Sequence, residues 1–385
     1  MLYVANEKRY DKMQYNRLGK SGLKLSGGYM LAAAHSDSPT FKLKEQPEKL
    51  SAGHYVQLST EKYGGMLMGT WLDRPLSAAG RVLVRQGEKL AVRLVDIDRD
   101  LLVIPNVAIH MNREANSNMK YNFAVDMQPL YGEKGGFRGR VARAAGAAEE
   151  DLLTYDLFLY NPQSGVEWGN YISAPRLDDL QCAFASLQGF LTAEESRNAC
   201  VYCLFDNEEV GSETKQGAAS PFLRDTLRRI ARGLGLDEEA HQAMLARSFL
   251  VSADNAHAQH PNHPEYSDSG NCPFLNEGIV IKFNANQRYA TDGISCALFR
   301  EVCRLADAPV QTYANRSDLP GGSTLGSIAN TKVPVNTVDI GLPQLAMHSA
   351  VETAGVEDLF SLVRAMTCYF SKTLVKEPAG IYCLK

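Results

Sequence analysis

Two adjacent glutamates, Glu208 and Glu209, directly follow the apolar run Ala199–Phe205. Neighbouring carboxylates at the end of a buried strand repel each other and lose hydration, so their placement indicates a compensating positive charge nearby. A divalent metal ion would supply that charge. Adjacent glutamates are otherwise typical of a solvated surface. The interpretation as a metal site therefore depends on whether other potential metal ligands lie at the same edge of the sheet.

Further metal-competent side chains occupy equivalent positions along the chain. They are His35 and Asp37 after Tyr29–Ala34, Asp254 after Ser248–Ala253, His348 soon after Val338–Leu342, and Asp178 at the start of a helix predicted for Asp178–Leu191. The carboxyl ends of strands in an open α/β sheet share one edge, where ligands bind. We therefore expect these groups to converge there.

Imidazole and carboxylate ligands without a thiolate favour Zn²⁺, Mn²⁺ or Co²⁺ in a hydrolytic site. A carboxylate that bridges two ions would make the site dinuclear. Each residue alone has a simpler interpretation, since an aspartate at a helix start is more often a cap and a lone histidine is more often a hydrogen-bonded residue. Four separate strand ends with such groups favour the metal site.

The second half of the chain alternates strands with helices, which predicts an α/β fold with a central mixed, mostly parallel sheet. Gly278–Phe283 completes the set of expected buried strands. The predicted helices are Asp178–Leu191, Leu223–Leu234, Gly293–Leu305 and Val356–Leu374.

Short alternating or β-branched runs dominate the segment from about residue 53 to 160. They are Tyr55–Leu58, Arg81–Val84, Leu90–Val95 and Leu101–Ile104. We expect residues 41–160 to form an inserted β-rich domain, and residues 1–40 and 161–385 to form the catalytic domain.

The composition excludes several classes of partner. A formal net charge of −4 over 385 residues, without a basic block, argues against nucleic acid. The apolar runs are too short to cross a membrane, and residues 1–10 lack the apolar core of a signal peptide. The eight cysteines, including the pair Cys200 and Cys203, are expected to be free thiols in a cytoplasmic protein.

The chain resembles the M18 family of metalloaminopeptidases, which includes aspartyl aminopeptidase and yeast vacuolar aminopeptidase I. The motifs run in family order over nearly the whole chain. They are HSDSP (35–39), YGG (63–65), TWLDRPL (70–76), IPNVAIHMNR (104–113), RLDDL (176–180), DNEEVGS (206–212), SADNAHAQHPN (252–262), IKFNANQRYAT (281–291), RSD (316–318), GST (322–324) and MHS (347–349).

The resemblance implies two metal ions, with Zn²⁺ the first choice and Co²⁺ or Mn²⁺ as alternatives. Asp178 would bridge them, with His35 and Asp254 completing one site and Glu209 and His348 the other. Glu208 would be the general base, because a neighbour that is close but not a ligand can take the proton of the attacking water.

Two further residues receive catalytic roles. Asp37 would orient the ring of His35, although an aspartate before Ser38-Pro39 also suits a turn. In the resembled family the histidine equivalent to His110 reaches into the active site of a neighbouring subunit. The resemblance thus implies a homo-oligomer, a dimer-based dodecamer assembled partly through the β-rich insert.

The aspartyl branch of the family implies a peptide substrate with an N-terminal Asp or Glu. A basic residue would then bind the side-chain carboxylate of the substrate, with Lys282 the first candidate and Arg288 the second. Both have structural alternatives, a strand-end lysine and a structural arginine. Two other functions stay open: a carboxypeptidase or N-deacylase on the same metal scaffold, and a catalytically silent or cargo-like oligomer.

The chain departs from the family pattern at Asp179, where the family usually has Asn, and at Gly321, where it commonly has Cys. Asp179 would raise metal affinity or face solvent. The histidines at 257, 260 and 263 are expected to be structural or to surround the site. The family also usually carries several dozen more residues before its first histidine ligand, and a shorter N-terminus is expected to weaken assembly.

Overall fold

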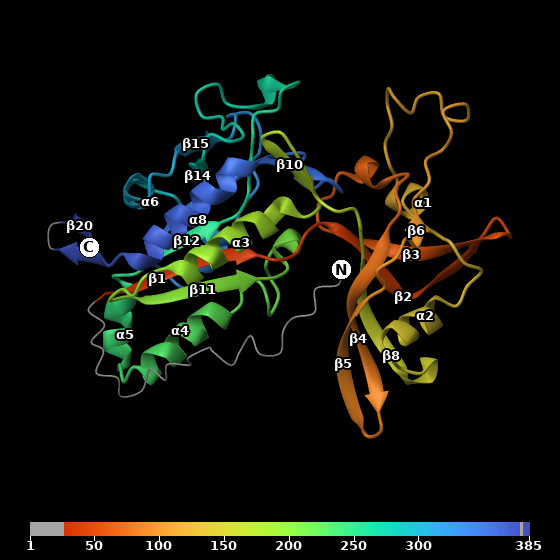
Figure 1. The fold of residues 1–385 in the computed structure, drawn as a ribbon, viewed down its shortest axis with the longest axis horizontal. Helices are drawn as coiled ribbons and strands as arrows, with labels where there is room; N and C mark the ends of the chain where they lie inside the picture. Colours follow the sequence, from red (N-terminus) through yellow and green to blue (C-terminus); the bar gives the residue numbers. More distant parts are fainter. Residues whose placement is uncertain (1–26, 378–379) are drawn as a thin grey trace.

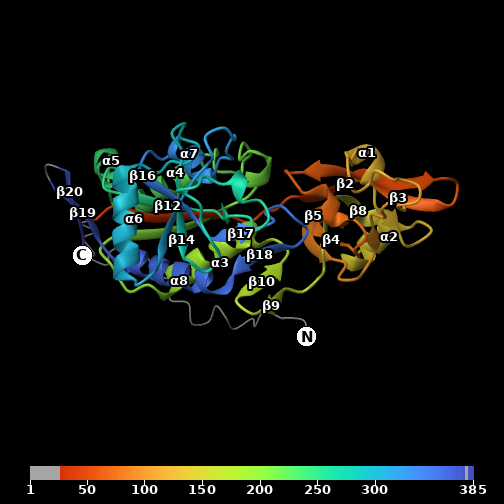
Figure 2. The same cartoon turned by 90° about the horizontal axis from the view of Figure 1, so that it is seen from above.

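The computed structural model describes residues 27–377 and 380–385, and it places them in two bodies joined by a narrow connection (Figures 1 and 2). One body contains a six-stranded and a five-stranded sheet with most of the helices. The other contains a seven-stranded sheet. The expectation for residues 1–10 lies outside the described residues.

The six-stranded sheet has the order β11-β1-β12-β16-β14-β15. Its strands are β1 (Tyr29–His35), β11 (Ala199–Phe205), β12 (Phe249–Ala253), β14 (Ile279–Phe283), β15 (Val310–Ala314) and β16 (Asn336–Gly341). All neighbours are parallel except β14 and β16. This confirms the predicted mixed, mostly parallel sheet.

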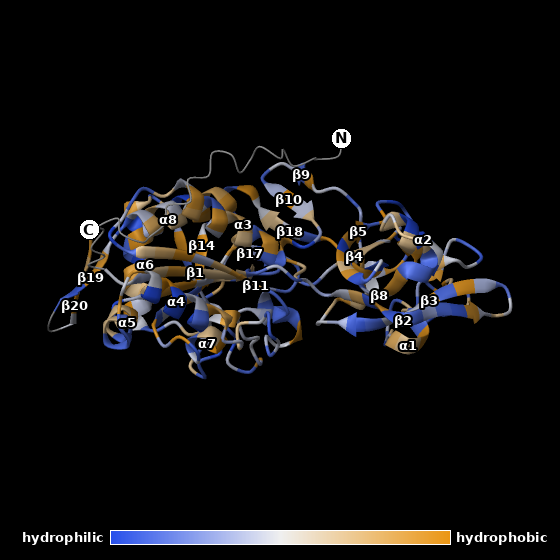
Figure 3. Ribbon diagram, turned by 90° about the horizontal axis from the view of Figure 1, so that it is seen from below, coloured by the Kyte–Doolittle hydropathy of each residue, from blue (hydrophilic) through white to orange (hydrophobic). Residues whose placement is uncertain are grey.

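Helices cover both faces of this sheet, as the apolar strand sequences require. Alternate residues of β1 enter different clusters: Met30 packs with α3 (Leu177–Thr192), α6 (Gly293–Leu305) and α8 (Val356–Ser371), and Leu31 packs on the opposite face. The helices of the opposite face are α4 (Phe222–Gly233), α5 (Glu238–Leu245) and α7 (Leu325–Asn330). Figure 3 shows the hydrophobic colouring of β1 and β14 between these layers.

A five-stranded sheet lies beside the carboxyl ends of the central strands. Its order is β13-β17-β18-β10-β9, with β9 (Val166–Trp168), β10 (Tyr171–Ala174), β13 (Ala256–His257), β17 (Pro343–Leu345) and β18 (Glu352–Gly355). Because β13 and β17 directly continue from β12 and β16, this sheet carries the chain across the edge where the candidate residues lie.

The second body is a seven-stranded sheet with the order β5-β4-β8-β2-β3-β7-β6. Its strands are β2 (Thr40–Ser51), β3 (Tyr55–Tyr63), β4 (Ser77–Gln86), β5 (Lys89–Asp96), β6 (Leu102–Val103), β7 (Leu130–Tyr131) and β8 (Leu152–Tyr160). Short helices α1 (Phe123–Asp126) and α2 (Phe137–Ala144) pack beside it, and its core forms a separate cluster that also includes Ala350 of the first body. The sheet thus spans residues 40–160, while the division of the chain into domains stays a prediction.

The strands predicted over Tyr55–Leu58 and Arg81–Val84 extend over β3 and β4, whereas two other predicted elements are shorter in the structure. The helix predicted to reach Leu374 ends at Ser371, because Lys372 is extended and Leu374 begins β19 (Leu374–Glu377), which pairs with β20 (Ile381–Leu384). The strand predicted over Leu101–Ile104 contains only Leu102 and Val103. No helix among the described residues is long and apolar enough to cross a membrane.

Candidate metal centre

The groups predicted from the strand ends do converge. Three sets of potential ligand atoms each lie within 4.8 Å of one another: His35, Asp178 and Asp254; Asp178, Glu209 and His348; and His35, Glu208 and Glu209. Asp178 belongs to the first two sets. The centre therefore has two halves that share one carboxylate.

The two oxygens of Asp178 face different histidines. Its Oδ1 lies 3.6 Å from His35 Nε2, and its Oδ2 lies 3.3 Å from His348 Nε2. Asp254 Oδ1 lies 3.7 Å from the same nitrogen of His35, and Glu209 Oε2 lies 3.4 Å from that of His348. A carboxylate with one oxygen directed toward each half has the arrangement of a bridging ligand.

Local structure brings each group to this edge. His35 is the last residue of β1, and Asp254 follows β12 directly. Glu209 lies on a 3-10 turn, Glu208–Val210, just after β11. Asp178 lies in the first turn of α3 with an extended backbone, and its carbonyl accepts a hydrogen bond of 2.9 Å from Ser38 Oγ.

Main-chain oxygens orient both histidines. His35 Nδ1 lies 3.1 Å from the carbonyl oxygen of Asp37, and His348 Nδ1 lies 2.9 Å from that of Gly65. Because a carbonyl oxygen only accepts, Nδ1 carries the proton and Nε2 presents its lone pair to the centre. Each Nε2 is the atom that faces Asp178.

The carboxylate of Asp37 has several partners. It lies 3.4 Å from His35 Nδ1 and accepts a hydrogen bond of 2.7 Å from Tyr63 Oη. It also accepts hydrogen bonds of 3.0 and 3.1 Å from the backbone amides of Glu208 and Glu209. The predicted contact with His35 is thus shared between the main chain and the side chain of Asp37. The carboxylate also holds the turn that carries both glutamates.

Glu352 is a buried carboxylate that supports the centre from outside the predicted set of residues. Its Oε1 accepts 2.7 Å from the amide of His348, and its Oε2 accepts 3.0 Å from the amide of Asp178. Glu352 therefore fixes the backbone of two proposed ligands. The sequence carries no signal for this role, because only the structure shows that the glutamate is buried, with 2% exposed.

Asp179 is fully buried, so the expectation that it faces solvent is wrong. One of its oxygens accepts a hydrogen bond of 3.2 Å from the backbone amide of His35, and the other accepts one of 3.2 Å from the backbone amide of Asn255. Burial raises the pKa of Asp179 well above its usual range. This residue ties the end of β1 to the segment after β12.

The donor set fits divalent cations. Asp178 Oδ1 and Glu209 Oε1 are buried and have no hydrogen-bond partner among the described residues. Burial raises the pKa of Glu209 to about 9. For His348, burial lowers the pKa, but the hydrogen bond with Asp178 and the charge of Glu209 outweigh this effect, so the pKa rises to about 9. The protein groups alone therefore retain protons that a bound cation would displace.

Glu208 is placed differently from Glu209. Burial, assisted by the charge of Asp254, raises the pKa of Glu208 to about 7. Its carboxylate lies close to potential ligand atoms of His35 and Glu209, but Glu208 is not a member of either set that contains Asp178. A carboxyl with this pKa can accept and return a proton near neutral pH.

The remaining candidates lie in other surroundings. Lys282 is buried, donates 2.7 Å to the carbonyl of Asn255, and lies 4.0 Å from Asp254 Oδ2. Arg288 and His110 are exposed, and His110 lies in the segment between β6 and α1 of the second body. Their predicted roles toward a substrate stay predictions.

Of the three histidines in the 257–263 segment, His257 lies beside the centre. Desolvation and the charge of Lys282 lower its pKa, and the charges that act on it include Asp178, His348 and Asp254. His263 instead pairs with Glu265 at 2.9 Å on the surface. Only the tertiary position separates these neighbouring histidines.

The α/β sheet and a cluster of imidazoles and carboxylates at its strand ends define a metal-dependent hydrolase. A family model described as Aminopeptidase I zinc metalloprotease (M18) matches residues 18–370. The chain therefore belongs to the M18 aminopeptidase family, whose members are metal-dependent enzymes that remove N-terminal residues from peptides.

Similar proteins agree with this assignment. The probable M18 family aminopeptidase 2 of Clostridium acetobutylicum is 45% identical over 350 residues, which cover 88% of this chain and 81% of the relative. That of Pseudomonas aeruginosa is 41% identical over 369 residues, 93% of this chain and 84% of the relative.

Solved structures are similar as well. A chain in the cryo-EM structure of the Ape4 and Nbr1 complex has a TM-score of 0.85 and 36% identity, covering 90% of this chain and 72% of that one. The S. cerevisiae mApe1 dodecamer has a TM-score of 0.76 and 27% identity, covering 89% and 79%.

Proposed function

We propose that this protein is a dinuclear aminopeptidase in which Asp178 bridges two divalent ions. The observation that carries this proposal is the geometry of Asp178, whose two oxygens lie 3.6 and 3.3 Å from the Nε2 atoms of His35 and His348. Asp254 would complete the first site and Glu209 the second. Zn²⁺ suits these ligands best, with Co²⁺ or Mn²⁺ as alternatives.

Two bound ions would lower the pKa of a water molecule and polarise the scissile carbonyl. Glu208 would take the proton from the attacking water and pass it to the leaving amine. Its pKa of about 7 supports this exchange, because such a carboxyl is readily ionised and readily protonated near neutral pH. Asp37 would hold Glu208 and His35 in position relative to each other through its contacts with both.

For the substrate, we propose a peptide with an N-terminal Asp or Glu. Lys282 on β14 would supply a positive charge beside Asp254, and Arg288 an exposed one in the loop that follows this strand. The position of Lys282 near a proposed ligand supports this choice. Its hydrogen bond to Asn255 means that a substrate carboxylate would share the ammonium group with the main chain.

We also propose assembly into a homo-oligomer, a dimer-based dodecamer in the cytoplasm. The similar mApe1 structure is a dodecamer. On the edge strand β5 of the second body, the alternate residues Leu90, Val92 and Leu94 are 67%, 63% and 86% exposed, and such an apolar row suits an interface. The eight cysteines are free thiols, as suits a reducing compartment.

The proposal is tested by metal removal and replacement. Protein stripped with a chelator should lose hydrolysis of aspartyl and glutamyl anilides and regain it with Zn²⁺, Co²⁺ or Mn²⁺. Leucyl and lysyl anilides at equal metal loading test the acidic preference. Glu208→Gln should lower kcat by about 10²-fold or more with unchanged metal content.

Other outcomes would select the alternatives. Equal cleavage of peptides with free and blocked N-termini would contradict an aminopeptidase and favour a carboxypeptidase or N-deacylase. A metal-loaded oligomer that hydrolyses no peptide would favour a silent or cargo-like protein.

A further inference from the structure

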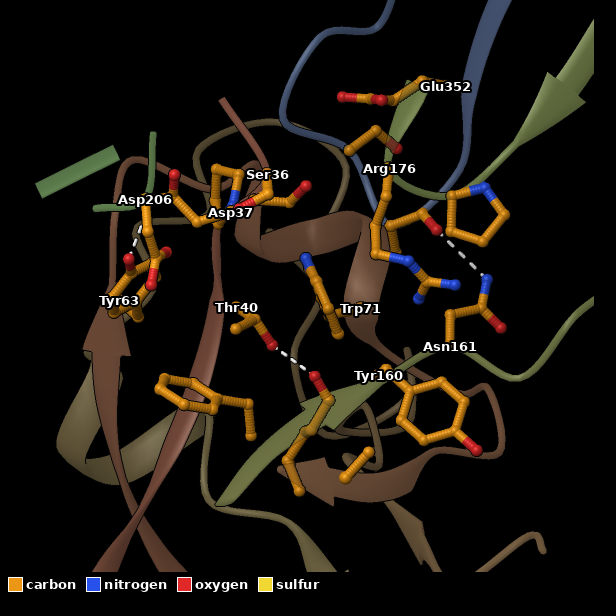
Figure 4. A pocket seen from close by; sticks show the side chains of 18 of the residues that line it. Ser36, Asp37, Thr40, Tyr63, Trp71, Tyr160, Asn161, Arg176, Asp206 and Glu352 are labelled. Carbon is orange, nitrogen blue, oxygen red and sulfur yellow. Dashed lines mark hydrogen bonds between the residues drawn. The ribbon is translucent and has the colours of Figure 1, made fainter. Parts of the chain in front are cut away.

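Tyr63, the last residue of β3, joins the second body to the turn that carries Glu208 and Glu209. Its hydroxyl donates a hydrogen bond of 2.7 Å to Asp37 Oδ2 and accepts one of 2.8 Å from Asn207 Nδ2. Tyr63 and Asp37 both line the pocket between the two bodies that Figure 4 shows. A side chain of the β-rich sheet therefore contacts a residue that supports the metal centre.

The direction of these hydrogen bonds follows from the surroundings of Asn207. Its Oδ1 accepts hydrogen bonds of 2.9 Å from Thr214 Oγ1 and 3.0 Å from Gln216 Nε2, so its Nδ2 is the atom that faces Tyr63. Because an amide nitrogen only donates, the tyrosine hydroxyl accepts from it and donates its own proton to Asp37. The hydroxyl thus bridges the Asp37 carboxylate and the residue that precedes the two glutamates.

The segment Tyr63–Leu67, which continues from β3, also contacts two of the proposed ligands, Glu209 and His348. The carbonyl oxygen of Gly65 lies 2.9 Å from His348 Nδ1, and the amide at the end of the segment donates 2.9 Å to the carbonyl oxygen of His348. Gly64 has a φ of +74°, and a Cβ at this position would lie 3.1 Å from Glu209 Cβ. The segment therefore lies directly against the half of the centre that contains both ligands.

The two oxygens of Asp37 serve different parts of the centre. Oδ2 accepts from Tyr63 and also, at 3.1 Å, from the backbone amide of Glu209. Oδ1 instead lies 3.4 Å from His35 Nδ1 and accepts 3.0 Å from the backbone amide of Glu208. His35 is further oriented by the main-chain oxygen of Asp37, 3.1 Å away. Loss of the tyrosine hydroxyl would therefore loosen mainly the oxygen that holds Glu209.

We propose that Tyr63 is a positioning residue through which the second body sets the metal affinity of the half that contains Glu209 and His348. This inference rests on the dinuclear site proposed above. The hydroxyl acts on Glu209 through Asp37, and the adjoining segment acts on His348 through its main chain. The other half is held by contacts within the first body, so its affinity should not depend on the tyrosine.

Competition between the full-length protein and a chelator for Zn²⁺ tests this proposal, because it measures the affinity of each ion. Asp254→Ala and His348→Ala assign the two steps to the two halves. Tyr63→Phe removes only the hydroxyl and keeps the ring, whose centroid is 5.4 Å from that of Phe158. We expect it to weaken the step of the Glu209 half by about tenfold or more and to change the other step by less than about twofold.

Tyr155→Phe is the matched control. Tyr155 is a buried tyrosine of β8, and its hydroxyl donates 2.7 Å to the carbonyl oxygen of Lys44 within the second body. Its loss should leave both affinities unchanged. The visible absorption of the Co²⁺-loaded protein adds a readout without turnover, because it depends on the arrangement of the ligands. Tyr63→Phe should alter this spectrum, whereas Tyr155→Phe should not.

Two glycine variants test the same segment without removal of a hydrogen bond. Gly64→Ala places a Cβ 3.1 Å from that of Glu209. Gly53→Ala, in the turn between β2 and β3, has a similar φ of +71°, but its Cβ meets no atom of the described residues within 4 Å beyond its own neighbours. Both variants strain the backbone alike. We expect only Gly64→Ala to weaken the step of the Glu209 half.

Selective weakening of one step in Tyr63→Phe, with both steps intact in Tyr155→Phe, would support the proposal. Unchanged affinities in Tyr63→Phe, equal weakening of both steps, or an unchanged Co²⁺ spectrum would each overturn it and leave the dinuclear site in place. A parent protein that binds a single ion would instead overturn the dinuclear site, and this inference with it.

Discussion

Glu208 and Glu209 are adjacent in the sequence, yet their surroundings differ. Glu209 faces His348 and belongs to the same set of potential ligands as Asp178, and burial raises its pKa to about 9. Glu208 lies outside that set, and its pKa is about 7. The turn after β11, whose two amides bond to Asp37, directs the two side chains into different surroundings.

At this scale we predict the pH dependence of the reaction. Glu208 accepts a proton only when ionised, so kcat/KM should fall as pH drops through its pKa. The protein raises that pKa from 4.5 to about 7, and bound cations would lower it again. We therefore expect the acid limb between pH 4.5 and 7, measured with an aspartyl anilide.

The control for this prediction is metal content at each pH, because protonation of His35 or His348 would also release metal. Glu208→Asp should reduce the rate without loss of metal. A rate that stays constant down to pH 4.5 with both ions bound would contradict the role of Glu208.

A second prediction concerns Glu352, which orients the amides of Asp178 and His348. Glu352→Ala should leave both amides without these acceptors and lower metal affinity by about 10–100-fold, as loss of supporting contacts typically does. Glu352→Gln, which keeps one carbonyl acceptor, should lose less. Metal affinity is measured by competition with a chelator, and equal affinity in all three proteins would contradict this role.

Among the elements, β16 anchors two loops of the first body. Asp339 on this strand is fully buried, accepts 2.7 Å from Thr324 Oγ1 at the start of α7, and accepts from the amide of Ala290. The loop after β14 and the segment before α7 are thus both tied to one carboxylate. Tyr289, which directly precedes Ala290, has its ring centroid 5.5 Å from Lys282 Nζ.

We predict that Asp339→Ala destabilises this part of the protein. Removal of the carboxylate leaves the buried hydroxyl of Thr324 unsatisfied at a cost of about 1–3 kcal/mol, and it also removes the acceptor of a partly buried amide. Urea unfolding at fixed protein concentration should show this loss, and Asp339→Asn, which keeps one acceptor, should lose less. Equal stability of the alanine variant and the parent protein would contradict the anchoring role.

On the scale of the whole molecule, His110 is the residue that one chain does not explain. It is exposed on the second body, in a segment where Met111 is 83% exposed. A catalytic role for His110 requires a neighbouring copy to bring it to another subunit's metal centre. Its position and the proposed oligomer are therefore one hypothesis.

Mixed oligomers test that hypothesis. His110→Ala and Glu208→Gln should each be nearly inactive alone, but coexpression should restore part of the activity, because the His110→Ala chain retains Glu208 and its partner supplies His110. Homo-oligomers of each variant, with their masses checked by light scattering, are the controls. Mixed oligomers without activity would contradict a histidine contributed by another subunit.

Several features of the protein follow from its sequence alone. Apolar runs located β1, β11, β12 and β14 within a residue or so, because burial on both faces leaves a continuous apolar signal. The rule that strand ends share one edge then brought together the residues of the centre. Family membership, recognised from motifs over the whole chain, is confirmed by the family model.

Tertiary structure decided what depends on contacts between distant segments. Glu352 bonds to Asp178 across 174 positions, and no local pattern distinguishes this glutamate from others. The burial of Asp179 and the separation of His257 from His263 have the same origin. Periodicity reports which face of an element is apolar, whereas the partner of a polar group depends on how the elements pack.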